Sequence, residues 1–169
     1  MTRRIAVLIA PWLLAAIVAL PCLEVALTRH AQADDWQPVE GKIATRWAKE
    51  IDPESVHAEY PRPTMVRDTW QNLNGLWQYA IRPKNESQPD SFDGRILVPF
   101  AVESSLSGVG KMVGEANQLW YRRTFNVPSD WLKSRVLLHF GAVDWQATVW
   151  INGEEVGQHR GGYDPFSFD

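Results

Sequence analysis

The stretch Trp145-Gln146-Ala147-Thr148-Val149-Trp150-Ile151-Asn152-Gly153-Glu154-Glu155-Val156-Gly157-Gln158-His159 carries the clearest structural pattern in this chain. Apolar residues occupy every second position from 145 to 151, which is the period of a half-buried β-strand. Asn152-Gly153 then supplies the two positive-φ positions of a tight turn, and residues 154–159 form the return strand. The pattern predicts a β-hairpin whose buried residues include Trp145, Val149 and Ile151.

The segments before this hairpin have the same character. Short alternating or apolar runs are separated by loops rich in proline and glycine, and no long helical period interrupts them. These runs lie at residues 76–81, 95–99, 119–127 and 135–140. Beyond the hairpin, Phe166 and Phe168 alternate as at the start of another strand. The spacing predicts an all-β fold, and specifically a β-sandwich.

The N-terminus has the three parts of a secretory signal peptide. Arg3-Arg4 is the positive region, residues 5–20 are an apolar run, and Ala31-Gln32-Ala33 is a small-x-small cleavage site. An uncleaved membrane anchor is the alternative, but this run is shorter than the roughly 20 residues that span a bilayer. We therefore expect cleavage after Ala33, export to the periplasm or the extracellular space, and no stable membrane insertion afterwards.

Removal of this peptide changes the composition of the chain. The remaining 136 residues would hold 14 basic and 19 acidic side chains, a formal charge of −5. A negative domain is a poor partner for nucleic acid or for an anionic membrane, because both require a basic face. The single cysteine, Cys22, would leave with the signal, so no disulfide would support the fold. The expected organisation is a signal peptide at 1–33, a polar leader at 34–62 and one β-domain at 63–169.

Five segments resemble, in the same order, the N-terminal sugar-binding domain of glycoside hydrolase family 2. They are Leu73-Asn74-Gly75-Leu76-Trp77, Val98-Pro99-Phe100 with Glu103-Ser104, residues 119–125 with Val127-Pro128, residues 141–157 around the hairpin, and residues 159–168. The resemblance implies a galactose-binding-like jelly roll. In β-galactosidases, β-glucuronidases and β-mannosidases of this family, that domain precedes an immunoglobulin-like domain and a catalytic (β/α)8 barrel. Because the chain stops at Asp169 inside the last segment, we expect the jelly roll to lack its last strand or strands.

The resemblance does not assign a catalytic residue to this chain. In the family, two glutamates of the barrel perform hydrolysis, and retaining enzymes hold their two carboxyl groups about 5 Å apart. The one Asn-Glu pair, Asn85-Glu86, lies in a loop rich in proline, with no barrel around it. Glu154 and Glu155 are neighbours on a predicted strand and should point to opposite faces. We therefore expect no catalytic residue here.

Sugar contacts are best placed at the turn after the hairpin, residues 159–164. Arg160 and Asp164 can hydrogen-bond sugar hydroxyls, and Tyr163 offers a ring on which a sugar can stack. The alternative is structural: the two glycines turn the chain, Tyr163 closes the core and Asp164 caps the turn. The predicted substrate-binding residues are Arg160, Tyr163 and Asp164.

Other patterns point to no cofactor. His57, His139 and His159 lack metal-ligand spacing, and the glycines of residues 107–111 lack the full phosphate-loop pattern. The favoured function is the non-catalytic, carbohydrate-binding front domain of an exported β-glycosidase, present as a fragment. An independent secreted carbohydrate-binding module is the main alternative, and a structural or adhesive β-domain is a third. A missing strand would also leave a sheet edge open to self-association.

Overall fold

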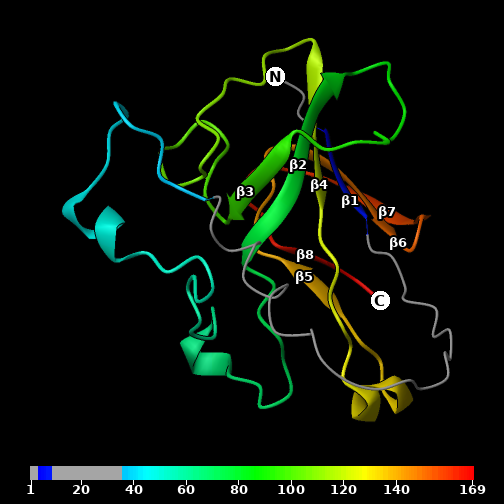
Figure 1. The fold of residues 1–169 in the computed structure, drawn as a ribbon. Helices are drawn as coiled ribbons and strands as arrows, with labels where there is room; N and C mark the ends of the chain where they lie inside the picture. The colour runs from blue at the N-terminus through cyan, green and yellow to red at the C-terminus, as the bar shows by residue number, and fades with distance from the viewer. Residues whose placement is uncertain (1–3, 9–35) are drawn as a thin grey trace, which may run out of the picture.

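The computed structural model describes residues 4–8 and 36–169, and this part of the chain is all-β, without an α-helix (Figure 1). The strands are β1 (Arg4–Leu8), β2 (Gly75–Pro83), β3 (Gly94–Val98), β4 (Asn117–Arg122), β5 (Leu138–Phe140), β6 (Gln146–Ile151), β7 (Glu154–Arg160) and β8 (Phe166–Phe168). Three short 3₁₀ helices, η1 (Arg46–Glu50), η2 (Pro63–Met65) and η3 (Ser129–Lys133), lie in the connections. The predicted all-β class is therefore confirmed.

The strands form two sheets. The larger has the order β3-β2-β4-β1-β6-β7, and the smaller pairs β5 with β8. Neighbours in the large sheet are antiparallel except for β1, which runs parallel to both β4 and β6. Aromatic residues of the small sheet pack against the core of the large sheet, so the two sheets enclose one apolar layer, as in a β-sandwich. The jelly-roll connectivity remains a prediction.

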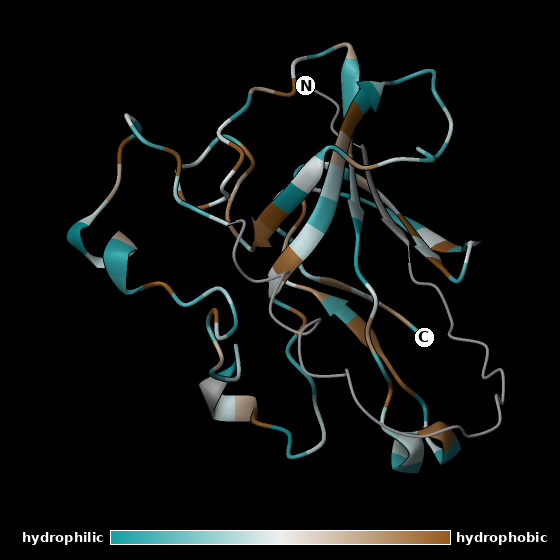
Figure 2. Ribbon diagram, in the orientation of Figure 1, coloured by the Kyte–Doolittle hydropathy of each residue, from teal (hydrophilic) through white to brown (hydrophobic). Residues whose placement is uncertain are grey.

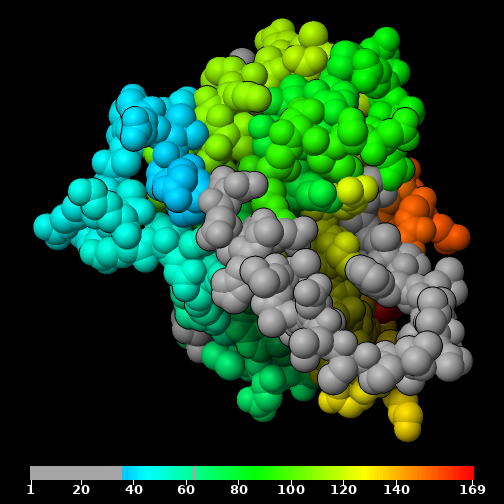
Figure 3. Space-filling model, in the orientation of Figure 1, coloured from blue at the N-terminus to red at the C-terminus, as the bar shows by residue number. Residues whose placement is uncertain are grey.

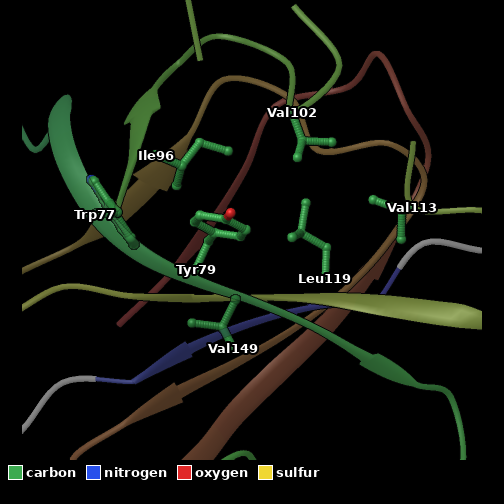
Figure 4. Close-up of a cluster of buried hydrophobic side chains, with 7 residues drawn as sticks. All are labelled: Trp77, Tyr79, Ile96, Val102, Val113, Leu119 and Val149. Carbon is green, nitrogen blue, oxygen red and sulfur yellow. The ribbon is translucent and has the colours of Figure 1, made fainter. Parts of the chain in front are cut away.

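The main core lies on one face of the large sheet, and Figure 4 shows its buried side chains meeting there. Strands β2, β3, β4 and β6 each contribute through the alternation of their residues. Two loop residues, Val102 and Val113, close the layer between them. The strand contributions are Trp77, Tyr79, Ile96, Leu119 and Val149. This layer fixes which faces of the strands remain for other uses.

The hairpin of β6 and β7 forms as predicted. Asn152 and Gly153 have φ values of 54° and 88°, and Ile151 pairs with Glu154 across the turn. Val149 is buried and Ile151 is partly buried against the core. The prediction for Trp145 was wrong, because its side chain is 36% exposed. Trp145 lies just before β6, which begins at Gln146, so the alternation of side chains along the strand does not determine which face the Trp145 side chain occupies.

Strand β5 is also shorter than the pattern at residues 135–140 predicts. Its partner β8 pairs with residues 138–140 alone, so the residues before them have no neighbouring strand in that sheet. Val136 and Leu137 are consequently 37% and 45% exposed.

The leader packs against the edge of the domain. Trp36 and Val56 form a buried cluster with Leu97 of β3, and the indole of Trp36 donates a hydrogen bond to the carbonyl of Leu106 (3.2 Å). Figure 3 shows this cyan segment lying beside the green strands and loops. The leader therefore adds apolar contacts to the domain.

Strand β1 falls inside the predicted signal peptide. Its backbone lies between β4 and β6, where Ile5 pairs with Leu119 on one side and with Ala147 on the other. The rest of the predicted signal, residues 1–3 and 9–33, lies outside the described residues. None of the helices in the described ranges has the length and hydrophobicity needed to cross a membrane.

Candidate functional site

The turn after β7 folds back onto the start of β6. Arg160 is the last residue of β7, and Gly161 follows with φ of +137°, a conformation that favours glycine. The backbone N–H of Gly161 donates to the carbonyl of Trp145 at 2.7 Å. A Cβ atom at Gly162 would lie 3.0 Å from Oδ1 of Asp144, so the two segments pack closely. Residues 160–164 are thus held beside Asp144 and Trp145.

Tyr163 projects into solvent at the tip of this turn. Its side chain is 96% exposed, so the structural alternative in which it closes the core is wrong. Arg160 and Asp164 are exposed as well. The guanidinium carbon of Arg160 lies 6.0 Å from the centre of the Trp145 ring. The three residues predicted from the sequence therefore share one exposed turn.

Trp145 is a neighbour of this turn that the sequence reasoning missed. Its position in the alternating pattern suggested a core residue, whereas it is partly exposed beside Arg160. The turn (Arg160, Tyr163 and Asp164) with Trp145 is called the exposed turn below. It presents two aromatic rings, one cation and one carboxylate, which are groups that can stack on a sugar and hydrogen-bond its hydroxyls.

A second feature lies on the face of the large sheet opposite the main core. It is a cleft of about 370 Å³ between the loop that follows β2 and strands β4, β6 and β7. Its lining residues are Lys84, Glu86, Ser87, Gln88, Gln118, Trp120, Thr148, Trp150, Glu155 and Gln158. Figure 2 shows the loop after β2 as mostly hydrophilic. The sequence predicted no cleft on this face.

The remaining candidates are dispersed. His139 pairs with Ser167, His57 lies 3.3 Å from Glu59, and the ring of His159 stacks on Phe166 at 4.1 Å. Among residues 4–8 and 36–169, no three histidine, cysteine or acidic side chains gather as a metal site would require. These histidines therefore give no indication of a shared function.

Comparison with known proteins shows what part of this chain is similar to. Residues 98–169 match the family model described as the sugar binding domain of glycosyl hydrolases family 2. The resemblance read from the sequence motifs is thereby confirmed for this part of the chain. The matched region includes both the exposed turn and the β6–β7 hairpin.

Individual relatives are full-length glycosidases. The chain is 30% identical over 116 residues to a β-glucuronidase of Paenibacillus borealis, covering 65% of this chain and 19% of that protein. It is 33% identical over 102 residues to a β-galactosidase of Thermoanaerobacter pseudethanolicus, covering 58% and 14%. The human β-glucuronidase is 30% identical over 132 residues, covering 65% and 19%. The chain thus spans about a fifth or less of the length of these relatives.

Proposed function

We propose that this chain is the non-catalytic, carbohydrate-binding front domain of an exported β-glycosidase. The observation that carries the proposal is the family 2 match over residues 98–169, with relatives that are β-glucuronidases and a β-galactosidase. A domain of this class would hold or orient a glycoside while carboxylates on another domain cleave it. The chain itself would bind sugar without hydrolysing it.

The exposed turn is the proposed contact with the sugar. Tyr163 would supply a stacking face, while Arg160 donates hydrogen bonds and Asp164 accepts them. Because the turn is open to solvent, few contacts would form with one sugar ring. An affinity no better than about millimolar, roughly −4 kcal/mol, is expected.

Sugar binding can be tested by titrating the full chain with nitrophenyl β-galactoside, β-glucuronide and β-mannoside in a calorimeter. The Tyr163→Ala/Asp164→Ala double variant should lose the binding. Ile43→Ala is a suitable control, because Ile43 is fully exposed and lies in the leader, outside the turn. Equal binding by the double variant and the parent chain would refute the assignment of the turn.

The same preparations test for catalysis through release of nitrophenol. No turnover is expected from the chain alone. Turnover that survives purification and disappears in Glu103→Gln, Glu86→Gln or Glu155→Gln would show that the chain is an enzyme by itself.

Export is a separate part of the proposal. Arg3-Arg4, the apolar run at 5–20 and Ala31-Gln32-Ala33 support cleavage after Ala33. Sequencing the N-terminus of the product from the periplasm or culture medium should begin at Asp34. Recovery of intact Met1 in a membrane fraction would favour an anchor instead.

A further inference from the structure

The cleft behind the main core is organised around two tryptophans. The rings of Trp120 on β4 and Trp150 on β6 stack at 5.6 Å between centroids, with 29° between their planes. Trp120 is 6% exposed, whereas Trp150 is partly exposed. Trp150 therefore offers an accessible aromatic face, and Trp120 supports that face from within the sheet.

Trp120 also has an unfilled hydrogen bond. Within the described part of the chain, its buried indole Nε1 has no acceptor. A buried N–H without a partner costs free energy, and such groups in native structures call for an explanation. Because this atom has almost no accessible surface, a ligand oxygen in the cleft would reach it only if the Trp120 side chain shifted.

One wall of the cleft is held in place by a buried amide. Gln118 is 4% exposed, and its Nε2 donates to the carbonyls of Pro83 (3.2 Å) and Glu86 (2.7 Å). These bonds tie the loop after β2 to β4, next to Trp120. The wall is therefore positioned before any ligand enters, which reduces the entropy lost on binding.

The opposite wall of the cleft is lined by polar side chains. Gln158 of β7 donates to the carboxylate of Glu155 at 2.9 Å, and Thr148 of β6 lies in the lining with its neighbours. Among the lining residues whose side chains the structure describes, the charged ones are Lys84, Glu86 and Glu155, which sum to a formal charge of −1. This balance disfavours an anionic ligand and suits a neutral one with many hydroxyls.

We propose that this cleft, in the chain that keeps β1 between β4 and β6, is a second carbohydrate site, in which a neutral sugar of an oligosaccharide stacks on Trp150 and hydrogen-bonds the amides and carboxylates of the walls. The volume of about 370 Å³ falls within the usual range for small-molecule sites. The site is adjacent to the exposed turn but distinct from it: on β7 the lining residue nearest to Arg160 is Gln158, two residues or about 7 Å away along the strand, and Glu155 lies about 16 Å away. The inference does not depend on sugar binding at the turn.

The test uses tryptophan fluorescence and calorimetry on the full chain, with cellotetraose, mannotetraose and lactose as neutral probes and glucuronic acid as an anionic probe. At least one neutral probe should quench fluorescence saturably. Trp150→Ala should weaken that binding by about tenfold, which corresponds to roughly 1.4 kcal/mol. Trp150→Phe, which retains a stacking ring, should restore part of the affinity.

Two controls separate this site from the exposed turn and from damage to the fold. Trp47→Ala removes a 55% exposed tryptophan from η1 in the leader and should leave the affinity unchanged. Tyr163→Ala, which removes the stacking ring of the exposed turn, should leave intact the component of binding that Trp150→Ala abolishes. Each variant is first compared with the parent chain by thermal melting.

Three outcomes would overturn the proposal. The first is no saturable binding of any neutral probe. The second is binding that survives Trp150→Ala but is lost in Tyr163→Ala, which would assign it to the turn. The third is tighter binding of glucuronic acid than of the neutral probes, because the cleft carries net negative charge.

Discussion

Both faces of the large sheet are buried, but different kinds of side chain cover them. On the core face, Ile96 and Val149 are 0% and 1% exposed and meet apolar side chains from the second sheet. On the opposite face, Gln118 and Thr148 are 4% and 6% exposed, yet they lie under a polar loop and beside a cleft. The core face is closed by an extended apolar layer, whereas the opposite face combines polar side chains with a smaller apolar cluster of Ala80, Phe92, Trp120 and Trp150.

This difference indicates where function can be located. An apolar layer between sheets tolerates neither a polar ligand nor water, because the desolvated groups would lose their hydrogen bonds. The opposite face already contains hydrogen-bonding side chains, two tryptophans and an indole N–H that has no acceptor among the described residues. Changes on the core face should therefore affect stability, and changes on the cleft face should mainly affect binding.

The largest effect is expected from removing residues 1–33, as the predicted cleavage would do. Strand β1 is the shared neighbour of β4 and β6, so its loss leaves both of those strands with an unpaired edge. Unpaired edges recruit other chains. Residues 34–169, expressed alone, should self-associate or precipitate more readily than the full chain, as measured by size-exclusion chromatography with light scattering.

A stable 34–169 monomer with a sharp, reversible melt would contradict this expectation. It would indicate that β4 and β6 find another arrangement once β1 is gone.

Truncation of the core face should give the next largest effect. Ile96→Ala removes a fully buried side chain of β3 and should destabilise the domain by about 3 kcal/mol, through lost burial and the cavity that remains. Trp150→Ala on the cleft face should cost less, because Trp150 is partly exposed. Urea unfolding of both variants measures the difference, and a larger loss for Trp150→Ala would reverse the ranking of the two faces.

The sequence predicted the core face better than the cleft face. Alternation in β6 and the Asn152-Gly153 turn were sufficient to locate the hairpin, because strand period and positive φ are local properties. The cleft depends on Gln118 reaching the carbonyl of Glu86, a contact between residues 32 positions apart in the chain. Alternation also could not show that Thr148, a polar residue, is buried.

The exposed turn was predicted in part. Residues 160–164 were selected for their chemistry, and the structure places them together because they are neighbours in sequence. Trp145 was wrongly predicted to be buried. It lies just before β6, where no pairing with a neighbouring strand determines which face its side chain occupies. Strand β1 was missed for a different reason: its apolar run also fits the hydrophobic region of a signal peptide.

A substitution in the turn between β6 and β7 should have a smaller effect on stability, and it concerns both faces because these strands contribute to each. Gly153 has φ of +88° with no atom within 4 Å of an added Cβ, so the cost of substitution comes from backbone conformation. Gly153→Val should destabilise the domain by about 1 kcal/mol or more, because a β-branched residue resists positive φ. Gly141→Val, at a glycine with equally open surroundings and no positive φ, is the matched control. Equal melting temperatures for the two variants would argue against a conformational role for Gly153.

The smallest effect is expected at Asp93, in the loop that covers the cleft face. Oδ2 of Asp93 accepts the N–H of Ile81 at 2.9 Å, and its Oδ1 accepts a charge-assisted bond from Arg82 at 2.7 Å. Burial alone would raise the pKa of Asp93, but these two hydrogen bonds and the Arg82 charge lower it overall. A carboxyl with a lowered pKa stabilises the fold above its unfolded pKa of about 3.9. That contribution is lost as the pH falls through the lower folded value.

The loop should therefore become less stable as the pH falls. Asp93→Asn should cost about 1 kcal/mol at pH 7, since Asp93 is partly exposed, and should flatten the dependence of stability on pH below about 4. Asp90→Asn is the control, because it removes the same charge at an exposed position in the same loop. Because the loop forms a wall of the cleft and takes no part in the main core, acid should weaken binding of a neutral oligosaccharide before the domain unfolds. Simultaneous loss of binding and of the fold, in both the parent chain and Asp93→Asn, would show that the two faces are one cooperative unit.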